Sequence, residues 1–314
     1  MALAETEALR FVAEVTGAGS ARRAERIQTL WSGYGELFRV ELEGADVPTV
    51  IVKWVKPPAR RGDRSHARKL RSYDVETTWY RTFASRCDTT CRVPTLLGSR
   101  TGKDEWLLVL EDLDGAGFSG RGGRGAGGLE ACLGWLAGFH ARFLGVAPAG
   151  LWKTGTYWHL ATRPDELANM DDAALREAAP LLDRMLGAAA FQTLVHGDAK
   201  LPNFCFAREA SSTATVAAVD FQYVGGGCGM RDVAYLISGA PGEGRLLDEY
   251  FRCLRDRLEP SVDAGALESE WRALYPIACA DFYRFLAGWA KESWRRDAHA
   301  QRVTREVLSQ LARA

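Results

Sequence analysis

The chain has 314 residues, of which 47% are apolar and 25% are charged, and its 40 Lys and Arg balance its 40 Asp and Glu. This composition is typical of a globular protein that forms one large domain or two modest lobes. The zero net charge argues against general binding of nucleic acid or of an anionic membrane surface.

The cysteines and the first residues bear on the cellular compartment. The seven cysteines are odd in number and scattered, and several lie in apolar runs. We therefore expect buried free thiols in the reducing cytoplasm. Cys87 and Cys91 are four residues apart, but no second Cys or His pair completes a zinc site. The N-terminus carries acids early and lacks a long apolar run, so we expect no signal peptide and no membrane span.

The first third of the chain predicts mainly β-structure. Residues 3–17 have helical spacing and end at glycines. Residues 29–44 read as a strand, a glycine turn and a second strand with alternating apolar residues. Residues 47–58 predict a third strand that is rich in β-branched residues and carries Lys53 in its middle. Residues 105–113 predict a further strand.

A basic segment follows the third strand. Residues 59–71 carry many Arg and Lys and few apolar residues, which indicates an exposed loop with a solvated surface. Ser72 is then in position to cap a helix that runs through Val75, Trp79 and Phe83 at spacings of four.

The remainder of the chain predicts mainly helices. Residues 115–128 contain eight glycines and indicate a lobe boundary or a flexible flap. The segment 120–125 matches GxGxxG, but it lies in low-complexity sequence and we regard the match as coincidental. Residues 265–295 predict a long helical stretch that is interrupted near Pro276. Two strand-like runs lie between the helices, at residues 203–207 and 214–224. This order predicts an α+β fold of two lobes, a small β-rich N-lobe (1–113) and a larger, mainly helical C-lobe (114–314).

The stretch LVHGDAKLPNFCF, residues 194–206, places polar residues between apolar flanks. Asp198 and Asn203 are five residues apart, which is the spacing of the base and the metal-binding Asn in the catalytic loop of protein kinases. Downstream, Asp220 ends an apolar run, where kinases place a second metal-binding Asp. One carboxylate can accept a hydroxyl proton, and a carboxylate with an amide oxygen suits Mg²⁺. The pattern therefore predicts a loop for phosphoryl transfer.

These motifs resemble a family of small-molecule kinases with a protein-kinase-like fold, which includes aminoglycoside phosphotransferases, choline kinases and ecdysteroid-kinase-like proteins. HGDAKLPN matches their pattern of His-Gly-Asp, four residues and Asn. His-Gly-Asp in place of His-Arg-Asp indicates small-molecule acceptors. VDFQ with Gln222, VLEDLDGAGF and MRDVAYLI are most similar to the ecdysteroid-kinase-like branch. The resemblance extends from about residue 30 to about residue 290.

The resemblance implies roles for matching positions. Asp198 would be the catalytic base, and Asn203 and Asp220 would bind Mg²⁺. Lys53 would contact the α- and β-phosphates of ATP and act in catalysis with Asp198 and Asn203. Glu76 would pair with Lys53, although Glu111 and Asp74 are competing candidates. Lys53 alternates with apolar neighbours, so strand geometry alone leaves its face open.

Further positions complete the implied nucleotide site. Gly33 and Gly35, in SGYGE, would form the loop over the phosphates, although the full GxGxxG is missing. Glu111 to Leu113 would be the hinge whose backbone meets the adenine. Asp232 would brace the catalytic loop, and His196 would hold its geometry without taking part in the chemistry.

The acceptor is less well defined by the sequence. The helical end of the chain supplies Asp281, Tyr283 and Trp289, which could line a pocket for an apolar or cationic alcohol. The same rings could instead fill the core of the C-lobe. His140 lies on an apolar helical stripe, where a packing role is the default.

The sequence thus predicts a cytoplasmic kinase that uses ATP and Mg²⁺ to phosphorylate a hydroxyl of a small molecule, without nucleic-acid or membrane partners. An aminoglycoside-type antibiotic phosphotransferase is an alternative, but the acids are dispersed and a polycation would need many carboxylates. A non-catalytic pseudokinase that senses a nucleotide or another small ligand is a second alternative. A protein kinase is disfavoured because no Ala-Pro-Glu follows Asp220. The oligomeric state and the choice between ATP and GTP stay open.

Overall fold

The computed structural model describes residues 4–58, 63–121, 127–208 and 215–313. The chain forms two compact units, one of residues 1–121 with 205–222 and one of residues 122–204 with 223–314. The first unit is built on a β-sheet and the second is mainly helical, which confirms the predicted α+β class. The predicted boundary between residues 113 and 114 assigned residues 205–222 to the C-lobe, whereas in the structure these residues belong to the first unit.

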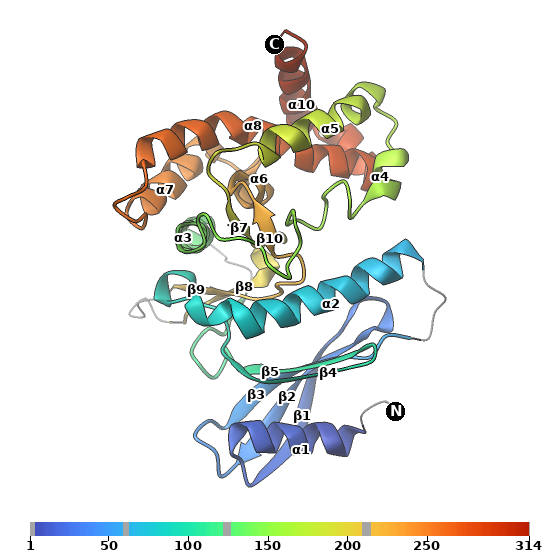
Figure 1. Ribbon diagram of the computed structural model, residues 1–314, viewed down its shortest axis with the longest axis vertical. Helices are drawn as coiled ribbons and strands as arrows, with labels where there is room; N and C mark the ends of the chain where they lie inside the picture. Colours follow the sequence, from blue (N-terminus) through green and yellow to red (C-terminus); the bar gives the residue numbers. More distant parts are fainter. Residues whose placement is uncertain (1–3, 59–62, 122–126, 209–214, 314) are drawn as a thin grey trace. The chain divides into compact units, whose positions relative to one another are not determined.

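An antiparallel sheet of order β1-β2-β3-β5-β4 forms the frame of the first unit. Its strands are β1 (Ser20–Thr29), β2 (Gly35–Glu43), β3 (Thr49–Val55), β4 (Leu96–Gly102) and β5 (Glu105–Glu111). The helix α1 (Glu5–Thr16) lies on one side of the sheet and α2 (Arg64–Thr82) on the other, as Figure 1 shows. The sheet is thus covered on both faces.

The alternation of β3 decides which of its residues face which helix. Val50, Val52 and Trp54 pack in the apolar core with Val12 of α1. Val55 belongs to a separate cluster with Tyr73 of α2. Because successive side chains of a strand point to opposite faces, Lys53 shares the α2 face with Val55. The structure therefore answers the question that the sequence left open for this lysine.

The helix α2 begins earlier than the sequence predicted. Asp63 caps it, with its carboxylate accepting a hydrogen bond from the backbone N–H of His66 (2.6 Å). Residues 64–71 are therefore helical, and the predicted loop over them is wrong because this cap starts the helix before the basic residues. Ser72 lies inside the helix, where its hydroxyl donates to the carbonyl of Lys69 (2.7 Å). Residues 59–62 of the predicted loop lie outside the described residues.

A small sheet of order β6-β8-β9 joins residues 205–222 to the first unit. Gly120 and Arg121 of β6 pair with Phe206 and Cys205 of β8. Leu113, Phe118, Cys205 and Ala217 form a buried cluster beside it. Its strands are β6 (Gly120–Arg121), β8 (Phe204–Phe206) and β9 (Val216–Ala218). Elsewhere in the first unit, short 3₁₀ helices lie between the main elements, namely η1 (Trp31–Gly33), η2 (Ala84–Arg86) and η3 (Thr89–Cys91). Residues 122–126 of the predicted glycine-rich flap lie outside the described residues.

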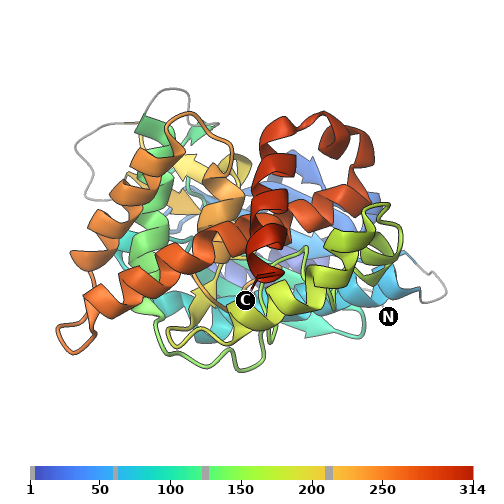
Figure 2. The same cartoon turned by 90° about the horizontal axis from the view of Figure 1, so that it is seen from above.

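The second unit packs its helices around α8. Its helices are α3 (Gly127–Arg142), α4 (Pro164–Ala168), α5 (Ala173–Gly187), η4 (Leu201–Asn203), α6 (Met230–Ile237), α7 (Glu243–Arg255), α8 (Ala264–Trp289), α9 (Lys291–Arg296) and α10 (Ala298–Leu311). The strands β7 (Thr193–Val195) and β10 (Gly225–Gly227) form an antiparallel pair. The helix α8 contacts α5, α6 and α10, and Figure 2 shows α10 in dark red beside it.

Pro276 does not interrupt α8, contrary to the prediction. A proline inside a helix removes one backbone hydrogen bond and often introduces a kink. Here the neighbouring residues Tyr275 and Ile277 are buried, as are most residues of the following two turns. Packing on both sides of the proline therefore keeps the helix continuous from Ala264 to Trp289.

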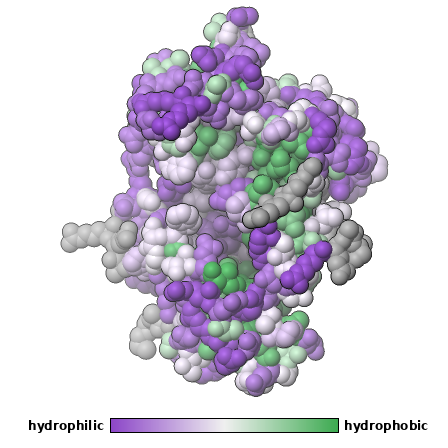
Figure 3. Space-filling model, turned by 180° about the vertical axis from the view of Figure 1, so that it is seen from behind, coloured by the Kyte–Doolittle hydropathy of each residue, from purple (hydrophilic) through white to green (hydrophobic). Residues whose placement is uncertain are grey.

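The surface agrees with the neutral, mixed composition. On the face shown in Figure 3, polar residues predominate and apolar ones form limited patches among them. Apart from Cys87, the cysteines are buried free thiols, as the sequence predicted. Within the described ranges, no helix combines the length and the apolar character that crossing a membrane requires.

Candidate active site

The first unit brings together the predicted phosphate lysine and its carboxylate partner. The Nζ of Lys53 on β3 lies 2.8 Å from Oε1 and 2.7 Å from Oε2 of Glu76 on α2. Both residues are buried, at 7% and 2% exposure. The competing candidates are engaged elsewhere: Glu111 pairs with Arg92, and Asp74 accepts a hydrogen bond from the indole of Trp106 (2.9 Å). The predicted pairing of Lys53 with Glu76 is therefore confirmed.

The charges around Lys53 keep it protonated. Burial by itself lowers the pKa of Lys53, but the negative charges of Glu76 and Asp220 and the hydrogen bond to Glu76 outweigh it and raise the pKa above its ordinary value. Burial raises the pKa of Glu76, with Lys53 acting against it and Asp220 adding to it. The ammonium is thus held as a fixed positive charge inside the unit.

Asp220 lies in a strained conformation next to this pair. Its φ is 68°, in the left-handed region that costs a non-glycine residue about 1–3 kcal/mol. Its Oδ1 lies 3.7 Å from the Nζ of Lys53, and its side chain is 38% exposed. Among the described residues, the buried Oδ1 has no hydrogen-bond partner. A buried carboxylate oxygen that accepts no hydrogen bond is well suited to bind a cation.

The glycine turn between β1 and β2 has the backbone that its sequence requires. Gly33 has a φ of 71° and Gly35 a φ of 144°. A Cβ on Gly35 would lie 2.1 Å from the carbonyl oxygen of Trp54, so only glycine lets β2 approach β3 here. Trp31 at the tip of the turn is 83% exposed. The phosphate contacts predicted for Gly33 and Gly35 stay a prediction.

The predicted hinge is built into the end of β5. The backbone N–H of Glu111 donates to the carbonyl of Thr95 (2.9 Å), and its carboxylate accepts from the Thr95 N–H (2.9 Å). The pKa of Glu111 is lowered because its bonds to Arg92 and Thr95 outweigh the effect of burial. Leu113 is buried, and its carbonyl accepts from the N–H of Phe118 (2.8 Å). The side chain of Glu111 thus anchors the strand end, which leaves any adenine contact to backbone groups.

In the second unit, Asp232 fixes the backbone of the His-Gly-Asp segment. Its carboxylate accepts hydrogen bonds from the N–H of His196 (2.6 Å) and of Gly197 (2.9 Å). It also contacts the Nε2 of His140 (3.2 Å), whose Nδ1 contacts the hydroxyl of Tyr250 (2.8 Å). Asp232 and His140 are fully buried. These contacts agree with the bracing role predicted for Asp232 and with the packing role of His140.

Gly197 is required by a close backbone approach. Its φ is 81°, and a Cβ there would lie 2.1 Å from the carbonyl oxygen of Tyr223. Its carbonyl accepts from the N–H of Tyr157 (3.1 Å), and His196 accepts from the N–H of Asp198 through Nδ1 (3.2 Å). These contacts on His196 and Gly197 fix the conformation of the loop that precedes Asp198. His196 thus stabilises the loop, as predicted.

Several donors hold the carboxylate of Asp198. The amide nitrogen of Asn203 donates to its Oδ2 (3.0 Å) and to its carbonyl oxygen (2.8 Å). The Nζ of Lys200 lies 2.9 Å from Oδ2, and the hydroxyl of Tyr235 donates to Oδ1 (3.2 Å). Since Asn203 uses its nitrogen for these bonds, its amide oxygen is the atom that could bind a cation. Asp198 and Asn203 therefore lie in hydrogen-bond contact.

The residues predicted to contact the acceptor do not form one group. Asp281 is buried (1% exposed) and pairs with Arg231 (2.9 Å) and Arg284 (3.1 Å). Tyr283 is also buried, and its hydroxyl is hydrogen-bonded to Ser238. We correct both predictions, because buried and paired groups of this kind stabilise the core of the unit. Trp289, at the end of α8, is 60% exposed and could meet a ligand.

Sequence reasoning assigned no role to Tyr235. It lies three residues after Asp232 on α6, and residues three apart share one side of a helix. This spacing was available in the MRDVAYLI motif and would have placed its side chain near the same loop. The ion pair between Arg231 and Asp183, with 2.8 Å between Nη2 and Oδ1, was also missed. The two residues lie far apart in the chain, and nothing in the sequence indicated that they meet.

Comparison with known families matches residues 27–264 to the phosphotransferase enzyme family (APH). A search of curated proteins finds no significant match. The fold is similar to that of the microcompartment-associated aminopropanol kinase, with 16% identity, a TM-score of 0.54 and coverage of 92% of this chain and 93% of the other. It is also similar to a thermostable mutant of the aminoglycoside phosphotransferase APH(4)-Ia in its apo form (15% identity, TM-score 0.51, coverage 97% and 99%).

Another mutant of that enzyme, in a ternary complex with AMP-PNP and hygromycin B, gives 15% identity, a TM-score of 0.51 and coverage of 96% and 97%. At such identities the likeness shows a shared fold. The family match spans most of the chain and includes Lys53, Glu76, the His-Gly-Asp segment and Asp220. The chain therefore belongs to the phosphotransferase enzyme family.

Proposed function

We propose that the protein is an ATP- and Mg²⁺-dependent kinase that phosphorylates a hydroxyl group of a small molecule. The observation that carries this proposal is the group formed by Lys53, Glu76 and Asp220. In it a buried ammonium lies between two carboxylates. The Oδ1 of Asp220 is buried and accepts no hydrogen bond among the described residues. Such a group has little structural purpose, because burying charges is costly. It fits the needs of phosphate and metal binding.

In this proposal, Asp198 receives the proton of the acceptor hydroxyl. The acceptor oxygen forms a bond to the γ-phosphorus as the bond to the β-phosphate oxygen breaks, which yields a phosphate ester and ADP. Asp198 suits this task because Asn203 and Lys200 hold its Oδ2. The protein contributes chiefly by positioning and by charge, as phosphoryl transfer requires.

Lys53 would contact the α- and β-phosphates, and the turn that carries Gly33 and Gly35 would cover them. The adenine would meet the backbone of Glu111 to Leu113. The nucleotide in the ternary complex of APH(4)-Ia is AMP-PNP, an ATP analogue, which supports ATP as the donor for this fold. These assignments rest on the order of the residues along the chain and on the family resemblance.

Mg²⁺ would be held by Asp220 and Asn203 and would neutralise charge on the phosphates. The unpartnered Oδ1 of Asp220 and the amide oxygen of Asn203 are hard oxygen donors of the kind that Mg²⁺ prefers. Within the described residues, no three His, Cys, Asp or Glu side chains gather in a way that could hold a metal ion. Mg²⁺ usually takes one or two protein ligands, with phosphates and water completing its shell, so these donors suffice.

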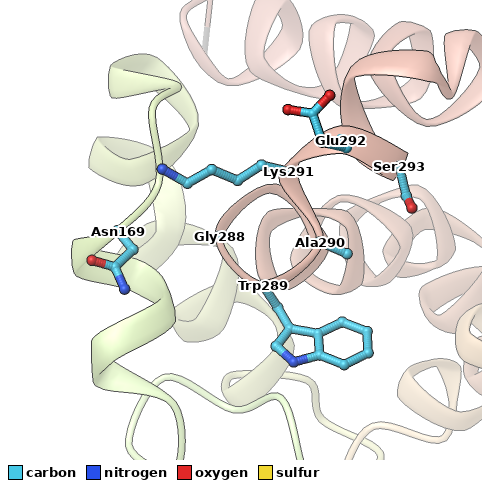
Figure 4. A pocket seen from close by; sticks show the side chains of 7 residues that line it. All are labelled: Asn169, Gly288, Trp289, Ala290, Lys291, Glu292 and Ser293. Carbon is cyan, nitrogen blue, oxygen red and sulfur yellow. The ribbon is translucent and has the colours of Figure 1, made fainter.

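The acceptor would be an alcohol with an apolar or singly cationic portion. A surface hollow of about 450 Å³ at the end of α8 is lined by Trp289, Lys291, Glu292 and Asn169. Figure 4 shows Lys291 extending toward the segment that carries Asn169, with Trp289 pointing away from Glu292. Nearby, Asp171 already pairs with Lys291 (2.7 Å).

Further carboxylates at this end of the unit are also neutralised within the chain. Glu166 pairs with Arg163 (3.1 Å), and Glu292 pairs with Arg295. A polycationic aminoglycoside would need carboxylates in excess, whereas a single exposed indole can stack on an apolar group or on one cation. The same assay on an aminoglycoside panel tests the antibiotic-phosphotransferase alternative, since aminoglycoside enzymes share the fold.

We also propose that the chain belongs to the ecdysteroid-kinase-like branch of the family, on the basis of Gln222 in VDFQ. The side-chain oxygen of Gln222 lies 3.2 Å from the hydroxyl oxygen of Ser72 on α2. This contact ties the segment that follows Asp220 to α2. The buried free thiols favour the reducing cytoplasm as the location.

The test combines nucleotide binding with turnover. Melting temperature is measured with ATP, with and without Mg²⁺, and then with a panel of alcohols beside a non-hydrolysable ATP analogue. Formation of ADP is measured with each alcohol. We expect a Mg²⁺-dependent nucleotide shift and a further shift from one class of alcohol.

Two substitutions separate the proposed roles. Asp198→Ala should abolish turnover while ATP still binds, and Asp220→Ala should remove the Mg²⁺-dependent part of nucleotide binding. Asp248→Ala, which removes an exposed carboxylate of α7, is the matched control and should behave as wild type. Unchanged turnover in Asp198→Ala would contradict the base assignment. No nucleotide shift at millimolar concentration would favour the pseudokinase.

A further inference from the structure

We propose that Tyr235 is a positioning residue for the catalytic carboxylate, because its hydroxyl holds Oδ1 of Asp198 and thereby directs that carboxylate toward the acceptor. This inference rests on the proposed function and adds a residue for which neither the sequence motifs nor the family match states a role. Tyr235 acts through Asp198 and is not itself assigned a contact with the substrate.

The two oxygens of Asp198 are held by different groups. The hydroxyl of Tyr235 donates to Oδ1 (3.2 Å), whereas Asn203 (3.0 Å) and Lys200 (2.9 Å) contact Oδ2. The contacts to Oδ2 come from the same loop as Asp198 and move with it. Tyr235 comes from α6, so its bond fixes the carboxylate against an independent element. A bond to each oxygen sets the plane of a carboxylate, which a bond to one oxygen does not.

The same helix also fixes the backbone of the loop. Asp232, one turn earlier on α6, accepts the N–H groups of His196 and Gly197. The helix therefore holds the loop twice, through its backbone and through the side chain of Asp198. Both contacts come from one rigid element, which is how a reacting group is kept within the narrow tolerance that catalysis needs.

The ring of Tyr235 is itself held in place by aromatic packing. It lies 4.7 Å from the ring of Trp158, 4.9 Å from Phe282 and 5.8 Å from Tyr157, measured between ring centroids. The backbone that presents Tyr157 and Trp158 is strained: Thr156 has a φ of 101° although it is not a glycine. Strain of this kind persists where the surroundings enforce it, often beside functional groups.

The hydroxyl of Tyr235 remains a hydrogen-bond donor at neutral pH. Burial raises its pKa well above the ordinary value, and the nearby charge of Asp198 and the hydroxyl of Tyr157 act in the same direction. A protonated hydroxyl beside a carboxylate can only donate to it. The polarity of the contact is therefore fixed.

The test uses the full chain and Mg²⁺-dependent ATP hydrolysis, with water as the acceptor. Tyr235→Phe keeps the ring packing and removes the hydroxyl. We expect kcat to fall about tenfold, which is what the loss of one bond to a charged group supplies. The KM for ATP should stay within about twofold, because the nucleotide contacts are untouched. The melting temperature should change little.

The matched control is Tyr275→Phe. The hydroxyl of Tyr275 donates to the carboxylate of Glu243 (2.9 Å), so this variant removes a buried tyrosine–carboxylate bond of the same kind from the same unit. We expect its kcat to equal that of wild type. A similar loss of kcat in both variants would show a general effect of destabilisation and would overturn the proposal.

A double substitution gives a second, independent readout. If Tyr235 acts through Asp198, then Tyr235→Phe should lower kcat less than twofold in an Asp198→Asn background. A further loss of about tenfold in that background would overturn the proposal. An active wild type with unchanged kcat in Tyr235→Phe would refute the positioning role alone, whereas an inactive wild type would refute the proposed function and the inference together.

Discussion

The buried pair of Lys53 and Glu76 allows a quantitative prediction about stability. Glu76→Leu leaves the ammonium of Lys53 buried, with the carboxylate of Asp220 at 3.7 Å as its remaining counter-charge. Removing one partner of a buried ion pair typically costs about 3–5 kcal/mol. Because Asp220 compensates in part, we expect the lower end, a loss of about 3 kcal/mol in the free energy of unfolding.

The reverse single substitution, Lys53→Met, should cost at least as much. It leaves the Glu76 carboxylate buried beside the negative charge of Asp220, and both burial and that charge raise the pKa of Glu76. The double variant, Lys53→Met with Glu76→Leu, removes both buried charges and replaces them with apolar side chains of similar size. It should unfold within about 1 kcal/mol of wild type, since such replacements are often neutral.

Urea unfolding of the four proteins, followed by tryptophan fluorescence, measures this cycle. A double variant as unstable as the sum of the two single variants would refute the reasoning, because it would show that the two charges do not compensate each other. The double variant should also lose Mg²⁺-dependent binding of ATP while it stays folded. Stability and nucleotide binding would then be separated in one protein.

Two further substitutions test the second unit. Gly197→Ala should lower the free energy of unfolding by about 2–4 kcal/mol and abolish turnover. The reason is that its Cβ would lie 2.1 Å from the carbonyl oxygen of Tyr223, at a φ of 81°. Wild-type stability and activity in this variant would contradict the close approach of the two backbones. Asp183→Asn should be less stable than wild type at pH 7, because hydrogen bonds and charges from His159 and Arg231 outweigh burial and hold the pKa of Asp183 well below its ordinary value. The extra stability of the wild type is fully present above the pKa of about 3.9 that Asp has in the unfolded chain, and it is lost as the pH falls below that value. The difference in the free energy of unfolding between wild type and Asp183→Asn should therefore become smaller when it is measured from pH 7 to pH 3.

The features that the sequence predicted well depend on short separations along the chain. The five-residue spacing from Asp198 to Asn203 brings the two side chains into contact within a single loop. The strand that carries Lys53 followed from its β-branched residues, and the helix that carries Glu76 followed from apolar spacing. Only the structure showed which face of the sheet Lys53 occupies. Alternation along a strand assigns residues to two faces, but it does not say which helix covers each face.

The features that the sequence missed depend on caps and on distant partners. Asp63 caps α2 nine residues before Ser72, the predicted cap of that helix, and its effect is visible only in the bond to His66. Asp281 looked available because its partner Arg231 is fifty residues away in the chain. The contact of Tyr235 with Asp198 spans thirty-seven residues, and its signal in the sequence was the three-residue spacing from Asp232. Helical periodicity shows which side of a helix is buried and does not identify the group that it meets.

The charges of the first unit give a reason why its candidate site needs a divalent cation. One ammonium, Lys53, faces two carboxylates, Glu76 and Asp220, so the group carries one net negative charge. A group with that charge would repel the phosphates that Lys53 is proposed to hold. Addition of a divalent cation at the unpartnered Oδ1 of Asp220 would change the net charge to one positive and reverse the repulsion. The order of events follows: nucleotide without Mg²⁺ should bind weakly, and the strength of binding should rise with the concentration of the ion until the Asp220 carboxylate is saturated.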